Sequence, residues 1–156
     1  MRTLSLLFLL ALTFGCKKSN SGDIDISAAT NILLLDAQGN NLLVSPAKIN
    51  VENIQVYYVK DGQTLSAYNG LMDTPKGVKV IKNQNGQEVL RVYLNTNEEE
   101  FPLTLIRFSE SDTDTIKATF NRKNGSVLCS KIWHNEVLKW DVTDPQAGEE
   151  HFTIIK

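Results

Sequence analysis

Residues 115–140 carry the clearest strand pattern in the chain and read TIKATFNRKNGSVLCSKIWHNEVLKW. Apolar and polar side chains alternate on both sides of the Asn-Gly pair at 124–125, a strong signal for a hairpin with a two-residue turn. That turn sets Phe120 opposite Cys129 and Ile116 opposite Trp133, all on one face. The segment therefore predicts two paired strands with an apolar side.

A second turn at 135–136 brings a third strand back to the same sheet, with Leu138 opposite Trp133 and Trp140 opposite Lys131. Lys131 then falls on the apolar face, so we expect it near a sheet edge with its stem along Trp140. The result is a three-stranded meander. Its apolar face is formed by Ile116, Ala118, Phe120, Cys129, Trp133, Leu138 and Trp140.

Two further hairpins follow from turn residues on either side of residue 70. Asp61-Gly62 predicts a two-residue turn, and Gln84-Asn85-Gly86 predicts a three-residue loop in which Gly86 takes the left-handed conformation. The predicted cross-strand pairs are Tyr58 with Leu65 and Val56 with Ala67 in the first hairpin, and Val80 with Leu90, Val78 with Val92 and Lys82 with Glu88 in the second.

The rest of the chain completes an all-β pattern. Strands are expected at 32–35, 103–108 and 152–155, which gives about nine or ten short strands, and no amphipathic helical stretch competes with them. We therefore predict one antiparallel β-sandwich over residues 25–156, immunoglobulin-like or similar, since two packed sheets would bury these apolar faces. A small β-barrel is the alternative.

The N-terminus reads as an export signal. Arg2 precedes the eleven-residue apolar run Leu4–Phe14, which is too short to span a bilayer as a helix. The run ends at Gly15-Cys16 and resembles the lipobox of bacterial lipoproteins. That resemblance implies removal of signal peptide 1–15 and acylation of Cys16, for example with palmitate, while polar residues 16–24 form a flexible tether. An ordinary cleaved signal, giving a soluble exported protein, is the alternative.

Composition limits the function. The chain has 156 residues, 42% of them hydrophobic, and a net charge of −2, which offers no basic field for nucleic acid. Two cysteines and two histidines cannot build a cysteine-rich zinc site. We expect no cofactor and no metal.

Few side chains suggest chemistry. No nucleophile elbow, P-loop, dinucleotide fingerprint or His-Glu-x-x-His segment occurs, so we expect no enzyme activity. Cys129 is expected to pack as a small hydrophobe, and His134 to be a solvated loop residue. Asp112 with Asp114, and the loop 36–41, offer oxygen ligands for calcium but lack the spacing of an EF-hand. Tyr57, predicted to point outward, is the candidate sugar contact.

A broader resemblance rests on three segments: Leu-Leu-Leu-Asp-Ala-Gln-Gly-Asn-Asn-Leu-Leu at 33–43, Asp-Thr-Asp-Thr-Ile at 112–116 and Lys-Ile-Trp-His-Asn at 131–135. Together they resemble small uncharacterised lipoproteins of Bacteroides-type bacteria. The resemblance implies a lipid-anchored β-sandwich and supplies no catalytic residues. Lys17, where Asp would favour the inner membrane, favours localisation of such lipoproteins to the outer membrane. The sequence fits either the periplasmic or the surface face of that membrane.

These observations predict a non-catalytic, lipid-anchored protein of the cell envelope that binds another envelope protein. Small antiparallel sandwiches leave strand edges that can accept a partner strand. The alternative is a carbohydrate-binding accessory lipoprotein of the outer membrane, with a glycan as ligand.

Overall fold

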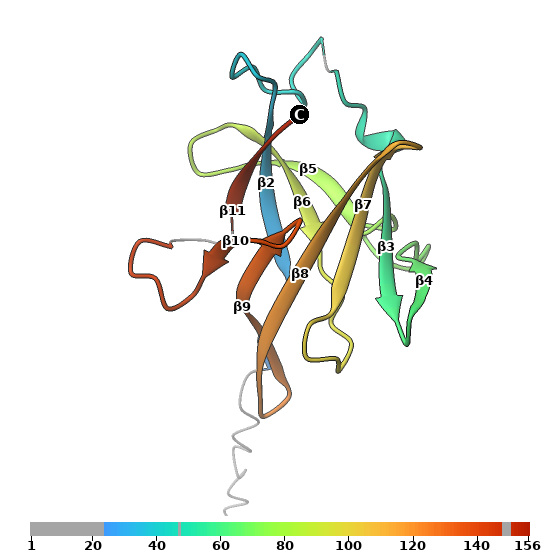
Figure 1. Ribbon diagram of the computed structural model, residues 1–156, viewed down its shortest axis with the longest axis vertical. Helices are drawn as coiled ribbons and strands as arrows, with labels where there is room; N and C mark the ends of the chain where they lie inside the picture. Colours follow the sequence, from blue (N-terminus) through green and yellow to red (C-terminus); the bar gives the residue numbers. More distant parts are fainter. Residues whose placement is uncertain (1–23, 47, 148–150) are drawn as a thin grey trace, which may run out of the picture.

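A computed structural model of the chain describes residues 24–46, 48–147 and 151–156. In these residues the chain forms two β-sheets and a single turn of 3-10 helix, η1 (Val51–Asn53) (Figure 1). The seven-stranded sheet contains, in spatial order, β1 (Ile26–Ser27), β9 (Ser126–His134), β8 (Asp112–Lys123), β7 (Leu103–Ser109), β3 (Gln55–Lys60) and β4 (Gln63–Ser66), with β10 (Val137–Asp141) also paired to β9. The four-stranded sheet contains β11 (His151–Ile155), β2 (Ala29–Leu35), β6 (Glu88–Tyr93) and β5 (Val78–Lys82).

The apolar core lies between the two sheets. Buried side chains come from the inner face of each, and they form one cluster. The cluster includes Ile32, Leu34, Leu90 and Val92 from the four-stranded sheet, and Val56, Ile106, Ile116 and Ile132 from the seven-stranded sheet. Neither sheet closes on itself in the described residues, so the predicted sandwich is confirmed and the barrel alternative is wrong.

The sheets are mixed rather than antiparallel throughout. β1 runs parallel to β9, and β11 runs parallel to β2. Parallel neighbours cannot be joined by a hairpin, and in both pairs the partners lie far apart in the sequence. Local turn signals therefore predict the hairpins but not these two pairings. The described residues contain no helix of the length and apolarity that crossing a membrane would require.

Two of the predicted hairpins are confirmed in register. Tyr58 pairs with Leu65 around Asp61-Gly62. Val80 pairs with Leu90 in the β5–β6 hairpin, where Gly86 has φ +75°. The predicted strands at 32–35, 103–108 and 152–155 are present as parts of β2, β7 and β11.

The third hairpin follows the prediction only near its turn. Phe120 pairs with Cys129, but a bulge on β9 then sets Ala118 opposite Ile132 and Ile116 opposite His134. The expected pairing of Ile116 with Trp133 is therefore wrong, because the extra residue reverses which side chains of β9 face inward. Ile132 is fully buried.

Trp133 and Lys131 consequently lie on the outer face, against the prediction. Trp133 is half-buried and its ring packs edge-on against Phe101 at 6.1 Å. Lys131 forms an ion pair of 2.8 Å with Asp141 on β10. Leu138 does pair with Trp133, and it is exposed rather than buried. A second bulge after Leu138 returns Trp140 to the core.

Candidate functional site

The open edges of the sheets differ in how well they are protected against pairing with another strand. The β5 edge carries Lys79 and Lys82, and β10 carries Lys139 at its bulge and lies against β11. Charges and bulges of this kind keep an edge from accepting a further strand. β4 has neither, since it reads Gln-Thr-Leu-Ser and pairs regularly with β3. In the described part of the chain β4 is thus an open edge without a lysine, a proline or a bulge. The edge strand β11 also has none of these, but β10 lies against it.

The backbone of β4 presents hydrogen-bonding groups to this open side. The Ala67 N–H donates to the Val56 carbonyl at 2.9 Å, so residues 63, 65 and 67 direct their backbone groups toward β3. Because bonding alternates along an antiparallel pair, Thr64 and Ser66 direct theirs away from β3. Each therefore offers one N–H and one C=O at the edge of the sheet.

Exposed apolar side chains surround the same edge. Leu65 on β4 is 47% exposed, and in the loop that follows, Tyr68, Leu71 and Met72 are 65%, 96% and 61% exposed. The prediction placed Leu65 on the buried face. Leu65 does face the same side of the sheet as Tyr58. It is nevertheless exposed, because β4 lies at the margin of the seven-stranded sheet, which is wider than the four-stranded sheet packed on it.

The loop of residues 67–77 is closed on itself by its own hydrogen bonds. Asn69 N–H donates to the Pro75 carbonyl at 2.7 Å, and the Asn69 side chain accepts from Leu71 N–H at 3.1 Å. Gly77 has φ +69°, and a Cβ there would lie 3.3 Å from the Ala67 Cβ. A side chain at 77 would therefore crowd the hairpin, and glycine allows the close approach.

The hairpin borders one hollow on each face. On the inner side, a hollow of about 440 Å³ is lined by Tyr58, Ala67, Leu71, Met72 and other residues of the loop. On the outer side, a hollow of about 330 Å³ is lined by Glu52, Gln55, Tyr57, Ser66, Tyr68, Lys76 and two apolar residues of β3 and its approach. We call Thr64, Ser66 and these two hollows the β4 edge site.

Tyr57 points to the outer face, as predicted. Its hydroxyl donates to Gln55 Oε1 at 2.6 Å, and the guanidinium of Arg107 lies over the ring, 5.0 Å from its centroid. One ring face is therefore covered by a cation and does not form an open stacking platform. Tyr68, in the same hollow, is far more exposed.

Leu71 and Met72 were not predicted from the sequence as contact residues. They lie in Asn-Gly-Leu-Met-Asp-Thr-Pro-Lys-Gly at 69–77, which contains only turn-forming and polar residues around them. Two adjacent apolar side chains in such a segment have no strand or helix face to join. That pattern is a usable signal for an exposed contact surface.

A cluster of polar groups joins β8, β9 and Lys156, the residue after β11. The Lys156 ammonium lies 2.6 Å from Asp112 Oδ1 and 2.8 Å from Asp114 Oδ2, and His134 Nε2 is 3.2 Å from the same Asp114 oxygen. The expectation that His134 is a solvated loop residue is wrong. The β9 bulge turns its side chain inward, where it lies 14% exposed.

This environment changes the acidity of Asp114. Burial by itself would raise the pKa of the carboxyl, but the Lys156 ammonium and the Asn135 amide, which donates to Oδ1 at 3.0 Å, hold that pKa below its ordinary value. The two carboxylates considered for calcium thus share an internal lysine cation.

The other acidic segment considered for calcium has the same arrangement. Asp36 forms an ion pair of 2.7 Å with Lys48 and accepts the backbone N–H groups of Gln38 and Asn40. The hydrogen bond from the Lys48 ammonium holds the pKa of Asp36 well below its usual range, and the hydrogen bonds from Asn40 lower this pKa further. In the described residues, no three or more His, Cys, Asp or Glu side chains are placed so that they could hold a metal ion together.

Cys129 is buried opposite Phe120, as predicted. Cys16, the proposed site of acylation, lies outside the described residues. No protein-family model matches the chain, and neither curated proteins nor solved structures gave a match.

Proposed function

We propose that this protein is a lipid-anchored, non-catalytic component of the cell envelope that binds an extended segment of another envelope protein at the β4 edge site. The supporting observation is the coincidence of an unprotected strand edge with exposed apolar side chains and a hollow on each face of the same hairpin. Exposed apolar patches of this kind typically mark interaction surfaces.

Strand addition explains each part of this surface. A partner segment lying antiparallel to β4 would exchange backbone hydrogen bonds with Thr64 and Ser66. Its side chains would alternate between the two faces, one toward Leu71 and Met72 in the inner hollow and the next toward Tyr68 in the outer hollow. The backbone bonds supply affinity and the two hollows supply sequence preference.

Lipid attachment at Cys16 would hold this surface at a membrane. Each buried methylene of an acyl chain contributes about 0.8 kcal/mol, so several chains give stable anchoring where one is marginal. Two partners confined to the outer membrane meet at a raised effective concentration, which allows a short edge such as β4 to be used. Membrane fractionation tests this part: Cys16→Ala should release the protein, and retention in the membrane would contradict acylation.

In-cell photo-cross-linking tests the binding surface. A photoreactive amino acid at position 71, next to β4, should give a discrete adduct with another envelope protein. The matched control places the same amino acid at position 79 on the lysine-bearing β5 edge, where no such adduct is expected. An absence of adducts at position 71, or the same adducts from both positions, would overturn the proposal.

Carbohydrate binding is the second candidate, favoured by the two tyrosines in the outer hollow. Tyr57 and Tyr68 lie there beside Glu52 and Lys76, which pair at 2.7 Å. A sugar ring would stack on Tyr68 more readily than on Tyr57, because Arg107 covers Tyr57. Loss of glycan binding in Tyr68→Ala would support this function, and unchanged binding would exclude this hollow.

A further inference from the structure

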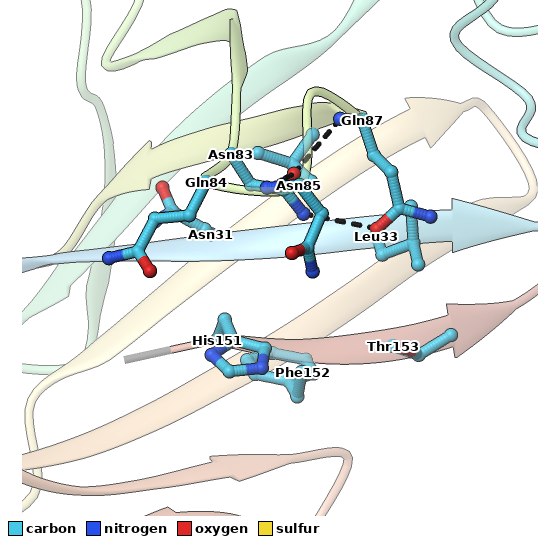
Figure 2. A pocket seen from close by; sticks show the side chains of 10 residues that line it. Asn31, Leu33, Asn83, Gln84, Asn85, Gln87, His151, Phe152 and Thr153 are labelled. Carbon is cyan, nitrogen blue, oxygen red and sulfur yellow. Dashed lines mark hydrogen bonds between the residues drawn. The ribbon is translucent and has the colours of Figure 1, made fainter. Parts of the chain in front are cut away.

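A third hollow lies on the outer face of the four-stranded sheet, away from β4. It has a volume of about 320 Å³, close to the lower end of the range for small-molecule sites, which is roughly 300–1,000 Å³. Figure 2 shows the loop of the β5–β6 hairpin on one side, with Gln84 and Asn85 reaching toward β2, and His151 of β11 opposite them. The described lining residues are Asn31, Leu33, Asn83, Gln84, Asn85, Gln87, Val89, His151, Phe152 and Thr153.

The lining has a consistent chemistry. Five of its side chains are carboxamides, while Leu33 and Val89 supply apolar surface and none of the described lining side chains is an acid, lysine or arginine. A carboxamide offers two N–H donors and an acceptor oxygen, so it can bind neighbouring hydroxyl groups at once. A ligand with many hydroxyls and an apolar C–H face fits this combination, whereas the described lining offers a charged ligand no acid, lysine or arginine side chain.

The loop that carries most of these groups is fixed before any ligand binds. Asn83 Oδ1 accepts the backbone N–H groups of Asn85 at 3.0 Å and Gln87 at 2.9 Å, and Asn83 Nδ2 donates to Gln87 Oε1 at 3.2 Å. Gly86 closes the turn by donating to the Asn83 carbonyl at 2.9 Å. Because Asn85 is held through its backbone, its side chain is available to face the hollow, and preorganisation of this kind lowers the cost of binding.

One wall of the hollow is oriented from the sheet. Asn31 on β2 is 6% exposed, and its Oδ1 accepts from Arg91 Nε at 3.0 Å. This bond fixes the carboxamide and uses the Nε–H of the neighbouring Arg91. We infer that the hollow between the 83–87 loop, β2 and β11 binds a neutral, hydroxyl-rich ligand, a neutral sugar residue of a glycan. This site shares no residue with the β4 edge site.

A glycan array with the full-length protein tests this inference, using neutral glycans together with sialylated and sulfated ones. Binding of at least one neutral glycan is expected. Asn85→Ala should weaken that binding about tenfold, the effect of about 1.4 kcal/mol that a lost hydrogen bond can have. Since only the Asn85 backbone supports the loop, the urea midpoint should not change. Gln63→Ala, which removes a carboxamide from β4, should bind as the parent does.

Three results would overturn the inference. They are an array without binding to any neutral glycan, binding confined to acidic glycans, and binding of neutral glycans that Asn85→Ala leaves unchanged. The photo-cross-linking from position 71 is independent of all three, because Asn85 lies in the β5–β6 loop and its hollow shares no lining residue with the one beside Leu71. Failure of this site and failure of the proposed strand binding can therefore be distinguished.

Discussion

Replacing Ile132 and Trp133 separately by alanine tests the bulged register of β9. Ile132 is fully buried in the core, and an isoleucine-to-alanine change at such a site costs about 2–5 kcal/mol of unfolding free energy. Trp133 lies on the outer face, where its side chain contacts Phe101 edge-on at 6.1 Å and lies under the Lys117 ammonium at 5.4 Å. These two contacts together contribute about 1–2 kcal/mol. Ile132→Ala should therefore be the more destabilising change.

Urea unfolding at neutral pH measures the difference. With a denaturant slope of about 2 kcal/mol/M, a loss of about 3 kcal/mol in Ile132→Ala lowers the midpoint by about 1.5 M, and Trp133→Ala lowers it by about 0.5–1 M. Trp140 remains as the fluorescent probe in Trp133→Ala. In the register without a bulge, Trp133 would be buried and its truncation would cost about 3–5 kcal/mol. A larger loss for Trp133→Ala than for Ile132→Ala would refute the bulged register.

Three further predictions concern acid, the lysine paired with Asp112 and Asp114, and the hairpin loop. Asp114 and Asp141 have lowered pKa values in the folded protein, about 2 for Asp141, mainly through its hydrogen bond from Lys131. Their contribution to stability is complete above the ordinary pKa of about 3.9 and is lost as the pH falls toward 2. The urea midpoint should therefore fall between pH 5 and 2. A midpoint that stays constant over this range would contradict the lowered pKa values. Lys156→Met should cost about 3 kcal/mol at pH 7 by leaving buried carboxylate charge unpaired, and calorimetry showing less than about 0.5 kcal/mol would argue against the ion cluster. Gly86→Ala should cost about 1 kcal/mol from its positive φ alone, because nothing lies within 4 Å of the added Cβ; an unchanged midpoint in urea would be inconsistent with the left-handed turn.

The hairpins were predictable because turn residues and cross-strand pairs specify them locally. Asp61-Gly62 and Gln84-Asn85-Gly86 each fix a loop length, and the loop length fixes the register of both strands. The β9 bulge has no comparable turn signal. The sequence did indicate that the register without a bulge was unfavourable, because that register places Lys131 on the apolar face. In the structure that conflict is removed because the bulge turns Lys131 outward to Asp141.

The candidate site depended on information that local sequence does not contain. Leu65 has the spacing of a core residue, and its exposure follows from the unequal widths of the two sheets. Widths result from long-range pairings such as β11 with β2, which no turn encodes. The cluster of Asp112, Asp114 and Lys156 likewise joins residues more than 40 positions apart.

The most direct test of strand binding at β4 removes one backbone donor from its open side. Thr64→Pro eliminates an N–H that faces away from β3, so the β3–β4 pairing should survive and the urea midpoint should change little. Thr64→Ala retains that N–H and is the matched control. With the photoreactive amino acid at position 71, we expect the envelope-protein adduct to persist in Thr64→Ala and to disappear in Thr64→Pro. An adduct of parental intensity in folded Thr64→Pro would contradict strand addition at this edge.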